Sequence, residues 1–146
     1  MKILIIEDDK LQFELIREIL SKFSELEPLD VVRIATEADF RSRLNEIAEN
    51  NPDVIMLDIM LRWADPNPNM QMPPKDVVDN GFERAGIRCG KLLSNNPKSR
   101  NIPIIVYSVL EAEDLDEDFI ALPNVRLLIK DFEPNSMLDA IKSCAI

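Results

Sequence analysis

The stretch Asp53-Val54-Ile55-Met56-Leu57-Asp58 is a short apolar run that ends abruptly in a carboxylate. A continuous apolar run of this length is typical of a strand that is buried on both faces of a parallel sheet. In such sheets, ligands and reactive groups collect at the carboxyl ends of the strands. Asp58 is therefore our first candidate for a reactive residue, and the rest of the chain can be tested for residues that converge on it.

The same alternation of an apolar run with a helical pattern occurs along the whole chain. Further runs of strand length occupy 2–6, 31–35, 102–107 and 125–129. Helical spacing follows the five runs over 11–23, 37–48 (with Thr36 as its cap), 82–94, a weak acidic stretch at 109–122, and from Pro134 onward. Five strand-then-helix repeats predict the α/β class, with a doubly wound five-stranded parallel sheet and helices on both of its faces.

Length and composition indicate one ordinary domain. The chain has 146 residues, of which 46% are hydrophobic, enough for a packed core. We expect a single domain over 1–146, with no second domain and no output domain after the last helix. No apolar run reaches the length of a membrane span, and the first residues lack a signal-peptide pattern.

Charge and residue types exclude several classes of function. The formal net charge of −10 argues against nucleic acid and against an anionic membrane surface as partners. The chain contains no His, which excludes Ser-His-Asp and Cys-His catalysis and His-ligated zinc. Cys89 and Cys144 are isolated in the sequence, so we expect reduced thiols and a cytoplasmic location.

Residues 59–80 differ from the rest of the chain. Four prolines and three methionines occur in this stretch, together with Trp63, the only Trp of the chain. Such a density of Pro is incompatible with a long regular element, so we expect an irregular insertion of about 59–80. The following helix can begin as early as Lys75, directly after Pro74.

Polar residues stand at the predicted carboxyl ends of four strands, and parallel strands bring these ends to one edge. They are Glu7 and Asp8, then Asp58, then Ser108, and finally Lys130. Clustered carboxylates repel one another unless a cation lies among them, and oxygen ligands alone suit Mg²⁺. Mg²⁺ together with a Lys ammonium can neutralise a phosphoryl group that is transferred to an Asp carboxylate.

The ordered set ILIIEDD, DVIMLD, IPIIVYS and a lone strand-end Lys resembles the receiver domain of two-component response regulators, over essentially the whole chain. The resemblance implies a flavodoxin-like (CheY-like) fold, with Asp58 as the phospho-acceptor. It also implies that Asp8 binds Mg²⁺ directly, Glu7 through water, and Met60 through its backbone carbonyl. In the same way, Ser108 is the implied switch hydroxyl and Lys130 the implied phosphate contact.

Several positions depart from the pattern of that family. The glycine that normally closes a short loop after the acceptor matches Gly86, so the loop carries an insertion of roughly twenty residues. The usual Lys-Pro pair is Lys130-Asp131, which puts the cis peptide that normally aims the lysine in doubt. Leu127 replaces the aromatic switch residue, and Val109 replaces the small residue after the switch hydroxyl.

The resemblance implies a single-domain response regulator rather than an enzyme. It would receive a phosphoryl group from a sensor histidine kinase or a histidine phosphotransfer protein, act as a monomer or weak homodimer, and signal to an unidentified downstream protein. The acidic stretch 109–122 lies on the conventional output face, so we expect either a partner with a basic patch there or a partner that binds the insertion instead. Met60 and Leu110 flank the acceptor, and both are apolar, so the phosphorylated form is expected to be long-lived.

Two alternatives remain open at this stage. One is a pseudo-receiver that binds proteins without being phosphorylated, which Asp131, Leu127 and Val109 favour. The other is a phosphatase of the haloacid dehalogenase type, which also places an Asp after a buried strand. That family needs a second Asp two residues later, where this chain has Met60, so we rank it lower.

Overall fold

One parallel sheet forms the centre of the computed structural model, which describes residues 1–144. The strand order is β2-β1-β3-β4-β5, and all four pairings are parallel. This is a doubly wound order: β2 is added on one side of β1, whereas β3, β4 and β5 are added on the other, so the strand order reverses between β1 and β3. The predicted fold class is therefore confirmed. The strands are β1 (Lys2–Ile6), β2 (Asp30–Ile34), β3 (Val54–Leu57), β4 (Ile104–Ser108) and β5 (Val125–Ile129).

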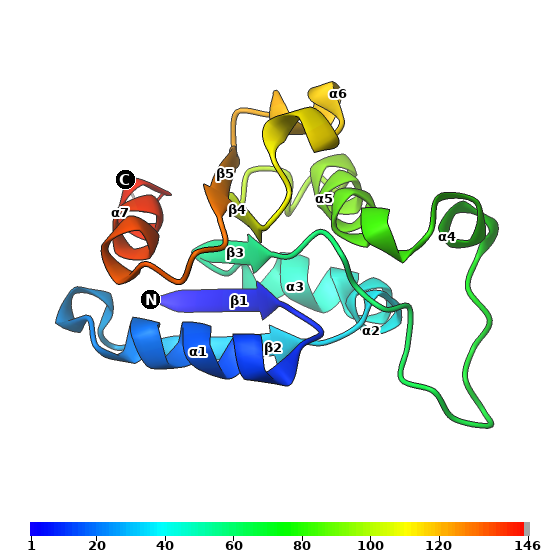
Figure 1. Ribbon diagram of the computed structural model, residues 1–146, viewed down its shortest axis with the longest axis horizontal. Helices are drawn as coiled ribbons and strands as arrows, with labels where there is room; N and C mark the ends of the chain where they lie inside the picture. The colour runs from blue at the N-terminus through cyan, green and yellow to red at the C-terminus, as the bar shows by residue number, and fades with distance from the viewer. Residues whose placement is uncertain (145–146) are drawn as a thin grey trace.

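Helices cover both faces of the sheet (Figure 1). The α-helices are α1 (Lys10–Ser21), α2 (Glu37–Ser42), α3 (Leu44–Asn50), α4 (Lys75–Asn80), α5 (Ala85–Asn95), α6 (Glu117–Ile120) and α7 (Pro134–Cys144). Short 3₁₀ turns are η1 (Ser24–Leu26), η2 (Phe82–Arg84) and η3 (Ala112–Asp114). Helices α1 and α7 pack on one face, while α2, α3, α5 and α6 pack on the other. No helix among the described residues has both the length and the apolar character that crossing a bilayer requires.

The central strands are buried on both faces, as the apolar runs predict. Every residue of β3 and β4 is buried. Along β3, Ile55 and Leu57 join the core under α2, α3 and α5, whereas Val54 and Met56 join the core under α1 and α7. Burial of each such side chain stabilises the fold by about 1.5–3 kcal/mol.

The two cysteines lie in different surroundings, and both are free thiols. Cys89 on α5 is completely buried in the core, and this burial raises the pKa of its thiol far above the ordinary value. Cys144 at the end of α7 is half-buried.

The predicted helix over 37–48 is interrupted. Thr36 accepts a hydrogen bond from the amide of Asp39, so its predicted role as the cap is confirmed. Helix α2 ends at Ser42, whose hydroxyl donates to the carbonyl of Asp39. Such a bond from a side chain to the backbone competes with helical bonding and bends helices. The chain turns at Arg43, and α3 then continues.

The prediction of one weak helix over 109–122 is wrong in its extent. The structure has the three-residue turn η3 and the four-residue helix α6 instead. Glu111 and Asp114 each accept a hydrogen bond from the other's backbone amide, and this reciprocal capping stabilises the start of the turn. The turn ends where the chain becomes extended at Leu115. Phe119 is buried and anchors α6 to the core.

The insertion is only partly irregular, so its predicted bounds need correction. After β3 the chain makes a long excursion without helix or strand as far as Pro74, and Figure 1 shows it (green) projecting away from the sheet. Helix α4 then occupies 75–80, inside the stretch predicted to be irregular. It begins directly after Pro74, as the sequence allows, and ends at Gly81, which has a left-handed φ of 81°.

Candidate functional site

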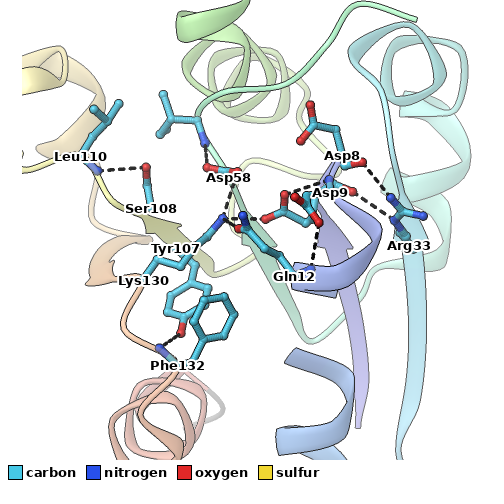
Figure 2. Close-up of polar contacts among 12 residues, drawn as sticks. Asp8, Asp9, Gln12, Arg33, Asp58, Tyr107, Ser108, Leu110, Lys130 and Phe132 are labelled. Carbon is cyan, nitrogen blue, oxygen red and sulfur yellow. Dashed lines mark hydrogen bonds and ion pairs between the residues drawn. The ribbon is translucent and has the colours of Figure 1, made fainter. Parts of the chain in front are cut away.

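Backbone pairing carries the sheet one residue beyond several strand ends and fixes the candidate residues at one edge. The amide of Glu7 donates to the carbonyl of Ile34 at 3.0 Å, and the amide of Asp58 donates to Ile6 at 3.0 Å. The amide of Lys130 donates to the carbonyl of Ser108 at 2.9 Å. The three ionisable side chains therefore start from adjacent, ordered backbone positions, and Figure 2 shows those of Asp58 and Lys130 converging.

The ammonium group of Lys130 joins the carboxylates of two strands (Figure 2). Its Nζ lies 2.6 Å from Glu7 Oε2 and 3.0 Å from Asp58 Oδ2. A third partner is Gln12 Oε1 of α1, at 2.7 Å. The Lys130 side chain is only 5% exposed, so these charge-assisted bonds form with little competition from water. Gln12 has no signal in the sequence, since its role depends on how α1 packs.

The three carboxylates predicted to bind a metal lie together. Glu7, Asp8 and Asp58 each offer an oxygen, and these oxygens lie within 4.8 Å of one another. Burial raises the pKa of Glu7 to about 7, and repulsion from the Asp58 carboxylate adds to this, while the bond from Lys130 opposes it. A group of acidic oxygens at this density fits a hard divalent cation, which would relieve the repulsion.

Two arginines hold the Asp8 end of this cluster. Arg33 donates from Nε to the carbonyl of Glu7 at 3.1 Å and from Nη2 to the carbonyl of Asp8 at 3.0 Å. Arg62 donates from its backbone amide to Asp8 Oδ2 at 3.1 Å, and its Nε lies 3.6 Å from the same oxygen. Neither arginine was predicted, because their positions on β2 and in the insertion carry no local pattern.

The remaining predicted residues surround Asp58. Asp58 Oδ1 accepts a hydrogen bond from the amide of Ile59 at 2.7 Å. Ser108 is buried at the end of β4, and its Oγ accepts from the amide of Leu110 at 3.2 Å. Met60 is half-buried two residues after Asp58. The role of its carbonyl as a metal ligand stays a prediction, as do the catalytic roles of the other residues.

Gly86 lies where the loop beyond Asp58 meets α5. Its amide donates to the carbonyl of Ile59 at 2.8 Å. A Cβ at this position would lie 2.2 Å from the carbonyl oxygen of Asp58 and 2.6 Å from the Cα of Ile59. Only glycine fits this approach, which agrees with its match to the glycine of ordinary receivers.

The segment after Lys130 takes a different course from a Lys-Pro pair. Within residues 1–144 the only cis peptide is Glu27-Pro28, so Lys130-Asp131 is trans. Phe132 has a left-handed φ of 56°, and its amide donates to the hydroxyl of Tyr107 at 2.8 Å. The two rings meet edge to face, with centroids 5.8 Å apart. Lys130 thus reaches Asp58 without the cis bond.

Comparison of sequences finds neither a matching family model nor a matching curated protein. Comparison of structures is informative. The signal receiver domain of a two-component histidine kinase from Clostridium thermocellum superposes with a TM-score of 0.72 at 14% identity, covering 98% of this chain and 95% of that one. The chain therefore has the fold of response-regulator receiver domains.

Two further structures with the receiver fold carry states relevant to the site. The Mn²⁺-bound form of response regulator Rcp1 matches with a TM-score of 0.64 and 20% identity, covering 99% of this chain and 90% of that one. The phosphorylated cyanobacterial phytochrome response regulator RcpA matches with a TM-score of 0.64 and 23% identity, covering 97% and 89%. At these identities the likeness establishes the fold, and the chemistry has to be argued from the residues of this chain.

Proposed function

We propose that this protein is a response-regulator receiver that accepts a phosphoryl group on Asp58. One observation carries the proposal: Lys130 Nζ lies within 3.0 Å of both Glu7 and Asp58 carboxylates, inside a cluster suited to a divalent cation. A purely structural ion pair needs one carboxylate, whereas this edge of the sheet holds three. The likeness to a phosphorylated and to a Mn²⁺-bound response regulator supports the same proposal.

In the proposed reaction an oxygen of Asp58 attacks the phosphorus of a phosphohistidine on a donor protein. An O–P bond forms as the N–P bond breaks, and the imidazole nitrogen keeps the electron pair and takes up a proton. Glu7, Asp8, Asp58 and the Met60 carbonyl would hold Mg²⁺, which when bound neutralises charge on the phosphoryl oxygens. Lys130 transfers its hydrogen bond from Asp58 to a phosphoryl oxygen, and the hydroxyl of Ser108 donates to another.

The donor is a sensor histidine kinase or a histidine phosphotransfer protein, and output passes through contacts with another protein. On this view the protein is not a turnover enzyme, because Asp58 is consumed when it is phosphorylated. Near α6, the carboxylates of Glu111, Glu113, Asp114 and Glu117 are exposed. Asp116 is already paired with Arg84 and Lys91. A protein that binds the exposed carboxylates near α6 would present basic residues to them.

Phosphorylation can be tested with a small donor. The protein is incubated with acetyl phosphate and Mg²⁺ and its intact mass is measured. We expect a gain of one phosphoryl group, absent without Mg²⁺ and absent in Asp58→Asn. A Lys130→Gln variant should bind Mg²⁺ but be phosphorylated far more slowly, which separates metal binding from phosphoryl transfer.

The pseudo-receiver remains the second candidate because of two exposed positions. Leu127 is 40% exposed and Val109 is 62% exposed, so neither packs as a receiver switch residue would. No mass gain with any phosphodonor, with Mg²⁺ bound, would favour this alternative. Steady release of phosphate from many esters would instead point to a hydrolase, which the half-buried Met60 opposes because it cannot transfer protons.

A further inference from the structure

The first residues of the insertion lie against the candidate metal site. Arg62 is four residues after Asp58, and its side chain is 50% exposed. Its backbone amide and its Nε both face Asp8 Oδ2, at 3.1 and 3.6 Å, and its Nη2 lies 3.5 Å from the carbonyl of Asp8. Its Nη1 lies 3.4 Å from Asp65, a second carboxylate within the insertion. Arg62 is thus a cation held directly beside a candidate metal ligand.

The same residues are joined to the start of α2. The amide of Glu37 donates to the carbonyl of Arg62 at 3.1 Å, and the amide of Ala38 donates to that of Trp63 at 2.8 Å. The guanidinium of Arg41 on α2 lies over the Trp63 ring, 5.8 Å from its centroid. The segment Arg62-Trp63 is therefore a strap, with Asp8 on one side and α2 on the other.

The charges around Asp8 indicate what the strap does. Without metal, the clustered carboxylates of Glu7, Asp8 and Asp58 repel one another. Of these three carboxylates, Lys130 bonds those of Glu7 and Asp58 but not that of Asp8. Arg62 supplies the positive charge for the third carboxylate. A divalent cation that bound Asp8 would have to share that carboxylate with the guanidinium, and the two like charges would repel.

We propose that Arg62 is a resident counter-cation that competes with the divalent metal for Asp8 and lowers metal affinity. This inference rests on the metal site of the proposed function. It makes the insertion a regulator of that site, because occupancy by metal weakens the contact that holds the strap. The strap then transmits metal binding to Trp63 and the start of α2.

The size of the effect follows from the charges. A divalent and a monovalent cation that share one carboxylate lie on the order of 5 Å apart, and in a water-like dielectric their repulsion corresponds to about a tenfold change in binding constant. Because Arg62 is half-exposed, salt screens this repulsion, so the effect should shrink in about 1 M monovalent salt.

The test is calorimetric titration of the full chain with Mg²⁺ at low ionic strength and pH 8, where the Glu7 carboxyl is mostly ionised. We expect Arg62→Gln to bind Mg²⁺ roughly tenfold more tightly than the wild type. Arg62→Lys, which keeps the charge, should remain within about threefold of the wild type. Trp63 emission of the wild type should change on Mg²⁺ addition, as a readout of the strap itself.

Arg43→Gln is the matched control, since it removes the same charge from exposed ion pairs with Asp39 and Glu46, which do not belong to the candidate metal site. It should leave Mg²⁺ affinity unchanged. Equal or weaker binding by Arg62→Gln would overturn the inference while leaving the proposed function intact. Absence of Mg²⁺ binding in the wild type and in every variant would refute both the proposed metal site and the inference about Arg62. Bound Mg²⁺ without phosphorylation of Asp58 would count against the proposed function alone.

Discussion

Replacing Gly86 with alanine tests how closely α5 approaches the acceptor strand. Helix propensity alone favours Gly86→Ala by about 1 kcal/mol, because Gly86 is the second residue of α5. Sterics oppose it: the new Cβ would lie 2.2 Å from the carbonyl oxygen of Asp58, where ordinary contacts begin at 3.4 Å. Both Asp58 and Ile59 contribute backbone atoms to this contact, so no side-chain rotation relieves it.

The steric cost should therefore exceed the gain in helix propensity. Overpacking of a well-packed core costs about 1–3 kcal/mol, and more where the backbone has to move. We expect Gly86→Ala to lower the free energy of unfolding by about 2 kcal/mol or more, and the Tm by about 6 °C. Displacement of the Asp58 carbonyl should also slow phosphorylation by acetyl phosphate.

Urea unfolding followed by circular dichroism, together with intact-mass kinetics, measures both effects. Gly90→Ala is the control within the same helix. Its Cβ would meet the ring of Phe119, a side chain, so stability should fall while the phosphorylation rate is kept. A Gly86→Ala protein as stable and as readily phosphorylated as the wild type would show that α5 does not pack on the acceptor loop as described.

Three further predictions follow from the ionic groups and the loop. Because the Glu7 pKa is raised to about 7, its protonated form stabilises the fold below pH 4.5, and this contribution is lost as pH rises through 7. The metal-free wild type should therefore lose about 2.5 kcal/mol of unfolding free energy between pH 5 and 8 from this group, measured by urea titration, and Glu7→Gln should lack that loss. Glu37 is fully buried and bonded to Arg88 Nη2 at 2.6 Å, so Glu37→Leu should cost about 3 kcal/mol in the same assay, whereas Glu14→Leu, which breaks an exposed pair, should cost under about 1 kcal/mol. Apolar Met60 and Leu110 should not position an attacking water, so phospho-Asp58 should persist beyond minutes, and decay within seconds by intact mass would contradict this.

The sheet and the residues at its edge could be predicted because their signals are local. Strands β1, β3 and β4 are nearly continuous apolar runs, which is what burial on two faces requires. In a parallel sheet, a polar residue directly after such a run must stand at the carboxyl edge. By that rule alone, the sequence predicts that Glu7, Asp8, Asp58 and Lys130 lie at the same edge of the sheet.

The rest of the site depends on contacts that leave no pattern in the sequence. Gln12 contacts Lys130 because α1 packs close to the carboxyl edge of the sheet. Arg62 contacts Asp8 because the first residues of the insertion lie against the same edge. The break of the second helix at Arg43 accompanies a bond from the Ser42 hydroxyl to the backbone, and η3 starts at a capping box made by the side chains of Glu111 and Asp114. The spacing of apolar residues indicates which positions are buried, but it does not indicate which polar side chains bond to one another or to the backbone.

Arg88 and Cys89 are neighbours on α5, and together they offer a way to time the opening of this region. Arg88 donates to the carbonyl of Gly81, at the end of the insertion, while the thiol of Cys89 is sealed in the core. An alkylating reagent can reach Cys89 only while α5 stands away from the sheet, whereas the half-buried Cys144 supplies an internal reference. The alkylation rate of Cys89 therefore reports how often α5 opens. A change in that rate after addition of a phosphodonor would show that phosphorylation of Asp58 alters the opening of α5.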